Sequence, residues 1–289
     1  MEKLTDMKRL YSIWWAKLIK GRQFLNYEKI VPFFLFFILV SAIPLKRPSG
    51  FKKTISTIVI DAGHGGNDPG SMSNGVKEKD ITLALALAFG KKLQEQIPDV
   101  KVIYTRSTDK FIPLWERATV ANKNAADLFI SIHCNSHSNT AITGSETFAM
   151  GLHKAESNLE VAKRENDVLL LENDYQERYE GFDPNSPESH IYFSLYQNAY
   201  MEQSIKLAAK VEHQISKGIN RPSRGVKQAG FVVLWKTGMP SILVESGFIS
   251  NLKDREYLRS TAGVEEMAGA MATAVLEYKK SFETPATPK

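Results

Sequence analysis

Residues 128–133 read Leu-Phe-Ile-Ser-Ile-His, a short run that is almost continuously apolar and ends in a histidine. Such a run predicts a β-strand buried on both faces, as in a parallel sheet that helices cover on both sides. Two further β-branched runs, residues 55–60 and 242–245, lead into a glycine-rich turn that holds His64 and into Glu245. Helical stretches separate these strands along the chain, so we predict an α/β protein.

The remaining elements are expected to follow the same alternation. The other expected strands are residues 101–105, 144–150 and 231–234, and the expected helices are 81–97 after an N-cap at Asp80, 114–126, 192–217 and 264–280. Together they predict a single, mostly parallel twisted sheet flanked by helices. A helical, acidic insert is expected at about residues 151–190, and an export segment at the N-terminus.

The N-terminal residues predict an export segment. Residues 1–29 are basic, and residues 30–45, IVPFFLFFILVSAIPL, carry no charge. This run is longer than a typical signal core of about 7–15 residues and shorter than a spanning helix of about 20, so both a signal cleaved after Ala42 and a signal anchor remain open. A buried core helix is the alternative. We expect export to the periplasm or cell envelope, with attachment to the inner membrane if the segment is retained.

The rest of the chain is divided more simply. Residues 46–54 are expected to be a linker, residues 55–282 one folded domain and residues 283–289 a tail. The formal net charge of +5 comes from the leader, because residues 1–53 hold eleven Lys and Arg against three acids and leave the remainder at −3. A mildly acidic body argues against a nucleic-acid partner. The single cysteine, Cys134, excludes an internal disulfide and a multi-cysteine metal site.

Side chains with acid, base or metal-binding chemistry follow three of the predicted strands. His64, His133 and Glu245 each stand at or just after a strand end, and Glu78 lies ahead of the first helix. Since the carboxyl ends of parallel strands line one crevice, we expect these residues to converge. Two imidazoles and a carboxylate are a common ligand set for catalytic zinc, so His64, Glu78 and His133 are predicted ligands and Glu245 a general base.

Each of these residues also has a simpler interpretation. A single histidine at a strand end is usually packed or hydrogen-bonded, and Glu78 within KEKD resembles a solvated run of charges. The glycines around His64 favour a functional turn, because they allow close approach of the backbone. Glu245 closes an apolar strand, where a carboxylate must be paired, protonated or near a metal.

The chain resembles the zinc-dependent N-acetylmuramoyl-L-alanine amidases of the cell-separation type, the amidase 3 family. The similar pieces are IVIDAGHGGNDPGS, KEKDITL, VIYTRSTDKFIPLWERATVAN, ADLFISIHCNSH, GSETFAM and ILVESGFISN, in this order across the body. The resemblance implies that residues 55–282 are a zinc amidase catalytic domain, with His64, Glu78 and His133 on Zn²⁺ and Glu245 catalytic. Cys134 departs from the small residue usual at that position.

The resemblance also implies a substrate. It is peptidoglycan, in which such enzymes hydrolyse the amide between the lactyl group of N-acetylmuramic acid and L-alanine of the stem peptide during wall remodelling and daughter-cell separation. Two other functions stay open. One is a zinc peptidase that cuts within the stem peptide, and the other is a non-catalytic wall-binding or activator protein.

The acidic insert is the expected regulator. Residues 151–190 contain ten acids against four Lys and Arg. The simpler interpretation is a solvated surface helix. Related amidases, however, carry an insert whose helix covers the zinc groove, and Glu165 and Glu172, seven residues apart, would share one helix face. Either is a candidate for the open metal position, and an envelope activator protein would then be needed to open the site.

Overall fold

The computed structural model describes residues 54–153, 155–172, 174–184, 186–194 and 199–284. The predicted basic segment 1–29, the hydrophobic segment 30–45 and the linker up to residue 53 lie outside the described residues. Within them, no helix combines the length and the apolar character needed to cross a membrane.

A six-stranded sheet forms the centre of the domain, in the order β4-β1-β5-β8-β6-β7. Its strands are β1 (Thr57–Ala62), β4 (Lys101–Tyr104), β5 (Leu128–Asn135), β6 (Ser145–Met150), β7 (Ser223–Ala229) and β8 (Ser241–Phe248). All neighbouring strands are parallel except β6 and β8. The prediction of an α/β fold with a mostly parallel sheet is confirmed. A separate two-stranded hairpin joins β2 (Met72–Ser73) and β3 (Val76–Lys77).

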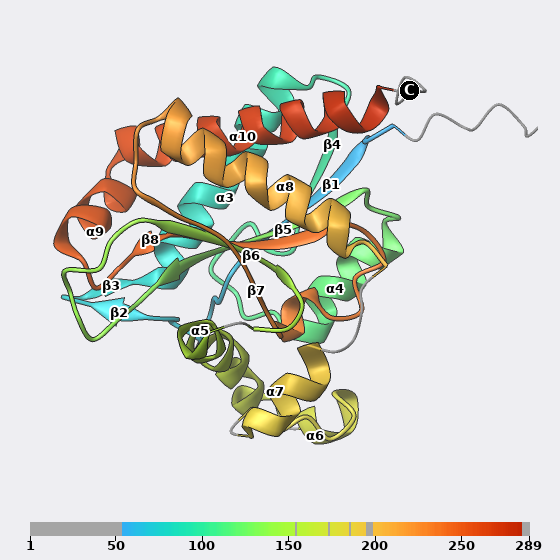
Figure 1. Cartoon of the computed structure of the whole chain (residues 1–289), viewed down its shortest axis with the longest axis vertical. Coiled ribbons are helices and arrows are strands. Elements are labelled where there is room, and N and C mark those ends of the chain that lie inside the picture. The colour runs from blue at the N-terminus through green and yellow to red at the C-terminus, as the bar shows by residue number, and fades with distance from the viewer. Residues whose placement is uncertain (1–53, 154, 173, 185, 195–198, 285–289) are drawn as a thin grey trace, which may run out of the picture. The chain divides into compact units, whose positions relative to one another are not determined.

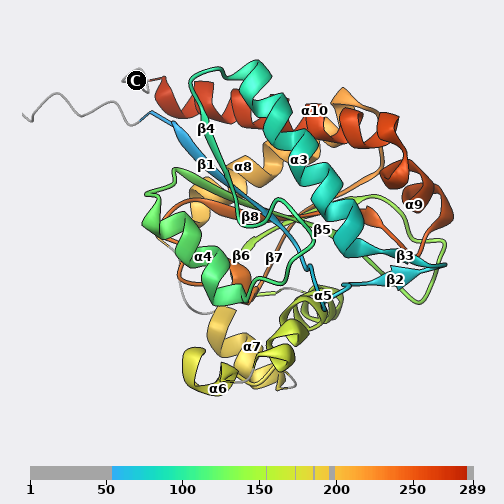
Figure 2. The same ribbon diagram turned by 180° about the vertical axis from the view of Figure 1, so that it is seen from behind.

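Helices cover both faces of the sheet (Figures 1 and 2). One face is covered by α3 (Glu78–Gln96), α8 (Met201–His213) and α10 (Thr261–Glu283), and the other by α4 (Leu114–Lys123) and the insert. Successive strand residues alternate between the two cores: Ile58 and Ile60 belong to the first, and Val59 belongs to the second. The strands therefore consist of continuous apolar runs because both of their faces are buried.

The insert consists of short helices packed against the second core. They are α5 (Glu156–Asn166), the 3-10 turn η1 (Asp167–Leu171), α6 (Tyr175–Arg178) and α7 (Pro187–Ser194). Val161, Ala162, Leu169 and Tyr179 are buried members of that core. The insert is thus bound to the domain by apolar contacts, and α5 is more than a solvated surface helix.

Local predictions differ from the structure in three places. Helix α3 begins at Glu78, three residues ahead of the predicted start, and Lys77 rather than Asp80 occupies the N-cap position. Residues 232–234 form a 3-10 turn, and the edge strand is instead β7, whose polar sequence SRGVKQA lacks the apolar run of a buried strand. Helix α9 (Leu252–Arg259), which follows β8, was not predicted.

Candidate metal centre

His64 lies in the turn that follows β1, and its ring is oriented by a carboxylate. Its Nδ1 is 2.7 Å from Oδ2 of Asp68, which leaves Nε2 to face the site. The residue has φ of 61°, a left-handed conformation that is costly for a side chain with a Cβ atom. Strain of this kind is typical of functional turns, where the surrounding structure maintains it.

Two glycines allow the histidines to approach the turn. A Cβ atom added to Gly63 would lie 2.5 Å from the His133 ring, and one added to Gly70 would lie 2.6 Å from the His64 ring. Gly70 also has φ of 65°. Both positions therefore require glycine, Gly63 for space and Gly70 for space and backbone conformation.

Glu78 is fully buried at the start of α3 and is held by backbone donors. Its Oε1 accepts a hydrogen bond from the Cys134 amide at 2.8 Å, and its Oε2 accepts one from the Ser71 amide at 2.8 Å. This carboxylate is therefore fixed in place, whereas the sequence alone placed it in a run of surface charges. Cys134, the residue after His133, packs in the core on the opposite face of β5.

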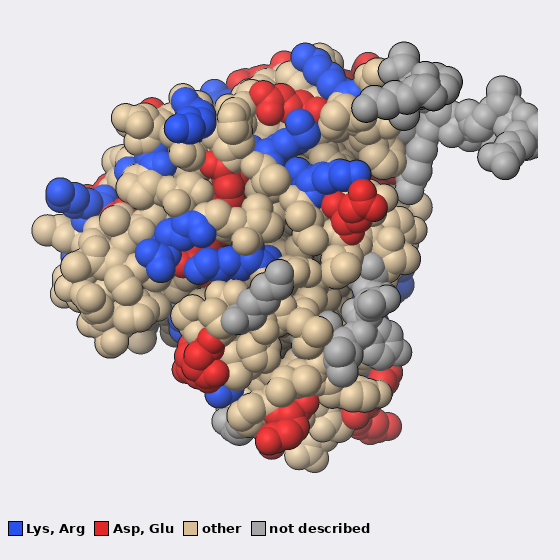
Figure 3. Space-filling model, viewed as in Figure 1, with Lys and Arg blue, Asp and Glu red and all other residues tan. Residues whose placement is uncertain are grey.

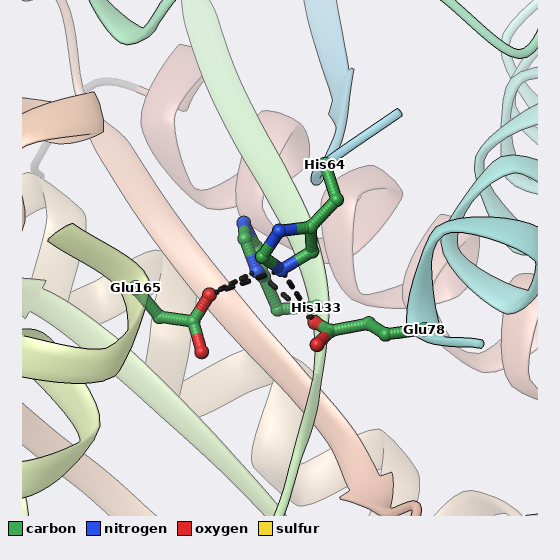
Figure 4. A group of neighbouring side chains, drawn as sticks. All are labelled: His64, Glu78, His133 and Glu165. Atoms are coloured by element: carbon green, nitrogen blue, oxygen red, sulfur yellow. Dashed lines mark ion pairs between the residues drawn. The ribbon is translucent and has the colours of Figure 1, made fainter. Parts of the chain in front are cut away.

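The four side chains His64, Glu78, His133 and Glu165 converge on one point (Figure 4). Oε1 of Glu78 lies 3.1 Å from His64 Nε2 and 3.2 Å from His133 Nδ1. From the other side, Oε2 of Glu165 lies 3.2 Å from His64 Nε2 and 2.8 Å from His133 Nδ1. Glu165 is carried by α5, so the insert completes a group begun by the sheet and α3.

The donor set fits a zinc ion. Tetrahedral zinc ligands at about 2.0–2.1 Å from the ion lie roughly 3.3 Å from one another, close to the four histidine–glutamate separations above. All four donor atoms lie within 4.8 Å of one another. His64 Nε2, His133 Nδ1 and Glu165 Oε2 are all buried, and none has a partner with hydrogen-bond geometry among the described residues. Buried polar atoms without partners are rare, and a shared cation would satisfy all three.

The carboxylates make the centre strongly attractive to positive charge. Burial lowers the pKa of the His133 imidazole, but Glu165 and Glu78 outweigh this effect and raise the pKa to about 9. Burial likewise lowers the pKa of His64, while Glu78 and the other nearby carboxylates raise it well above its usual value. Protons and a divalent cation would therefore compete for the same two nitrogens.

Glu245 lies beside this group on the neighbouring strand, in register with His133. Its side chain is fully buried, and neither carboxylate oxygen has a hydrogen-bond partner among the described residues. Burial raises its pKa well above the usual range, and the carboxylates of Glu165 and Glu78 raise it further. The nearest cation is Arg164, whose Nη2 lies 3.6 Å from Oε1 of Glu245.

Two buried arginines hold the backbone of the His64 turn by hydrogen bonds to its carbonyl groups. Arg117 pairs with Asp61 at 2.8 Å and donates to the carbonyl oxygen atoms of Ala62 and His64. Arg106 donates to the carbonyl oxygen atoms of Ala62 and Gly63. Both arginines thus have structural roles in this turn. Asp109, which lies between them in the sequence, pairs with Lys79.

Glu172 does not lie at the centre. Helix α5 ends at Asn166 and a 3-10 turn follows, so Glu165 and Glu172 do not share a helix face, and that prediction was wrong. Instead, Oε1 of Glu172 accepts a hydrogen bond from the Leu114 amide at the start of α4, and both of its oxygens accept one from the Tyr179 hydroxyl.

Two residues of the site were not predicted from the sequence, Asp68 and Arg164. Their only signal in the sequence was that they lie close to His64 and Glu165 along the chain.

Known proteins similar to this chain are N-acetylmuramoyl-L-alanine amidases. The chain matches the N-acetylmuramoyl-L-alanine amidase family model over residues 58–277. It is 33% identical over 243 residues to the N-acetylmuramoyl-L-alanine amidase AmiA of Escherichia coli K12. The alignment covers 83% of this chain and 81% of AmiA.

Solved structures give the same result. An N-acetylmuramoyl-L-alanine amidase from Clostridium difficile 630 superposes with a TM-score of 0.59 at 28% identity, covering 79% of this chain and 99% of that one. The amidase AmiC2 of Nostoc punctiforme superposes with a TM-score of 0.54 at 26% identity, covering 78% and 97%. The family model spans every strand that leads into the centre, from β1 to β8. The chain therefore belongs to the amidase 3 family of N-acetylmuramoyl-L-alanine amidases.

Proposed function

We propose that the protein is a zinc-dependent N-acetylmuramoyl-L-alanine amidase that releases stem peptides from peptidoglycan. The observation behind this proposal is the convergence of His64, Glu78 and His133 around one point, with Glu245 beside them on the adjacent strand. His64, Glu78 and His133 would hold the ion. When bound, zinc polarises an amide carbonyl and lowers the pKa of a water molecule to about 7.

The residues of the chain supply the remaining chemistry. Glu245 would take the proton from the attacking water and deliver it to the leaving nitrogen of L-alanine. Its buried setting favours the protonated form, which suits the second half of that transfer. Asp68 would keep the His64 ring in the orientation that directs Nε2 to the ion, as carboxylate partners of metal-bound histidines do.

Mass spectrometry of fragments released from purified sacculi tests this function. We expect intact stem peptides with a free L-alanine amine, in the presence of zinc and not after chelation. Shortened peptides would indicate the zinc peptidase instead, and sacculus binding without release of fragments, with or without a chelator, would indicate a non-catalytic wall-binding protein. The Glu245→Ala variant should lose activity by on the order of a hundredfold or more while it retains its zinc.

We further propose that the protein is autoinhibited by α5. Glu165 occupies the fourth position around the centre, and Arg164 next to it approaches Glu245 and donates to Asn135 at 3.0 Å. One helical turn thus covers both the metal ligands and the base. Because α5 also buries apolar side chains, opening requires a partner with higher affinity for the open form.

An envelope activator protein would supply that affinity. Exposed apolar side chains lie on the insert and its flanks, where such a partner could bind: Leu152, Leu170, Leu171, Ile191 and Tyr192. Acidic side chains lie on the same part of the molecule in Figure 3, below a group of Lys and Arg side chains. Export through residues 30–45, to the periplasm or envelope, would place the enzyme beside its substrate.

A further inference from the structure

A groove lined mostly by hydroxyl, amide and basic residues lies where three segments that lead away from the metal centre come together. Its volume is about 620 Å³. One wall is the β2–β3 hairpin, which begins just after Ser71, the residue whose amide bonds Glu78. The second wall is the loop after β5, which follows His133, and the third is the loop after β8, which follows Glu245. Figures 1 and 2 both show this hairpin at the same end of the domain as α9.

Hydrogen bonds between the three segments hold the groove in shape. The His137 amide donates to Ser250 Oγ at 3.0 Å, and Asn251 Nδ2 donates to the Thr140 carbonyl at 2.7 Å. Arg255 Nη1 donates to Ser73 Oγ at 3.1 Å, which ties the hairpin to α9. A cross-linked groove of this kind is preorganised, so a ligand would lose little free energy in ordering it.

The groove contains a buried cation that lacks a close acidic partner. Arg255 is only 4% exposed, and its one carboxylate neighbour within 4.0 Å among the described residues is the exposed Glu256, at that limit. Lys253 adds a second positive charge with no ion pair in the described part of the chain. The adjacent Asp254 is already used by Arg221 and by the Gly144 and Phe248 amides.

We propose that this groove binds the carboxylate-bearing stem peptide of the substrate, with Arg255 and Lys253 contacting a peptide carboxylate. The inference rests on the proposed amidase function. That function presents two sides of the scissile amide to the enzyme, a neutral glycan and a peptide whose residues carry carboxylates. Buried guanidinium groups bind carboxylates strongly, so the charge of the groove matches the peptide. Hydroxyl and amide side chains along its walls would contact the peptide backbone.

The groove is formed without the insert. All of its lining residues come from the hairpin, the loop after β5, and the segment from Ser250 to Arg255. Peptide binding should therefore occur while α5 still covers the metal centre. This separates the groove from the autoinhibited site and allows it to be tested in the full-length wild-type chain.

Calorimetric titration of the full chain with a synthetic stem tripeptide, L-alanyl-γ-D-glutamyl-L-lysine, provides the test. We expect measurable binding, with affinity at least about threefold weaker for the peptide in which the D-glutamyl carboxyl is amidated. Lys253→Glu should weaken binding by a similar factor, and Arg255→Lys should remove the preference for the free carboxyl. Lys123→Glu, the same charge change at the exposed end of α4, should leave the affinity unchanged.

Two results would overturn the assignment. Equal affinity for the free and amidated peptides in the wild type is one. The other is binding of a murein disaccharide that carries no peptide. If Lys253→Glu weakens the binding of this disaccharide by the factor expected for the peptide, the groove is a glycan site. If Arg255→Lys does not fold, the comparison of the free with the amidated peptide and the Lys253→Glu variant still test the proposal. Absence of lactyl-amide cleavage by the Glu165→Ala variant, in which α5 no longer supplies a carboxylate to the centre, would refute the amidase function. Cleavage without selective peptide binding would refute only the groove.

Discussion

At the scale of single residues, the metal centre depends on side chains that never contact it. Asp61 is fully buried, pairs with Arg117 and accepts hydrogen bonds from Thr105 and Ser131 at 2.6 Å. Arg117 in turn holds the carbonyl of His64. The position of the first histidine is therefore set by a buried ion pair between β1 and α4, and loss of either partner should disturb both stability and metal binding.

This ion pair predicts a specific pH dependence of stability. Burial alone would raise the pKa of Asp61, but Arg117 and the two hydroxyl donors outweigh it and lower the pKa below its usual value. A carboxyl with a lowered folded-state pKa stabilises the fold above its unfolded pKa of about 3.9. This contribution is lost as the pH falls through the folded-state pKa.

Asp61→Asn should therefore lower the free energy of unfolding by about 3–5 kcal/mol at pH 7, because Arg117 is left buried and unpaired. The difference from the wild type should shrink below about pH 4. Urea unfolding at pH 7 and at several values between pH 4 and 3 measures it. Asp99→Asn, at an exposed turn, serves as the control. A constant difference across this range would show that Asp61 does not titrate as described.

At the scale of elements, α5 is the proposed cover of the centre, and two of its glutamates test this proposal. Glu165 and Glu160 lie on the same helix, but Glu165 faces the histidines while Glu160 is exposed and pairs with Lys163. Glu165→Ala should raise the basal release of stem peptides from sacculi by on the order of tenfold, the equivalent of about 1.4 kcal/mol of closed-state stability. Glu160→Ala should leave it unchanged.

Zinc content separates this effect from a metal defect. Three ligands remain in Glu165→Ala, so the variant should bind about one zinc per chain, like the wild type. Equal basal activity in both variants, with equal zinc content, would exclude α5 as an inhibitor. Glu172 bonds the Leu114 amide at the start of α4 and has no contact with the histidines among the contacts described, so Glu172→Ala should not raise basal activity.

At the scale of the whole molecule, the metal should join the two halves of the domain. The proposed ligands come from the β1 turn, α3, β5 and, through Glu165, the insert. A ligand that binds only the folded chain stabilises it by about 2.7 kcal/mol at one hundred times its Kd. For a domain of this size, that corresponds to a rise in Tm of roughly 5–10 °C.

Chelation should therefore lower Tm by that amount, and calorimetry with and without zinc measures it. Glu245→Ala should show the same zinc-dependent shift, because Glu245 is not a proposed ligand. His133→Ala should show little or none. A zinc shift that persists in His133→Ala would place the ion elsewhere.

Much of the domain could be predicted from local patterns. The buried strands were recognisable because both faces of a parallel sheet are covered, which turns each strand into an apolar run, as in LFISIH. The edge strand β7 escaped recognition because it is half-exposed and polar. Glu78 was predicted just ahead of the first helix, but it is the first residue of α3. Its burial could not be predicted, because the Ser71 and Cys134 amides reach it only in the folded chain.

The sequence by itself determined that His64, His133 and Glu245 stand at the same edge of one sheet, since strand direction and strand ends follow from local hydrophobicity and the crossover rule. Only the tertiary structure decided which insert carboxylate reaches them. A seven-residue spacing places two side chains on one face only while the helix continues, and α5 ends at Asn166. The groove with Arg255 is likewise a property of three loops far apart in the chain, brought together by the sheet order.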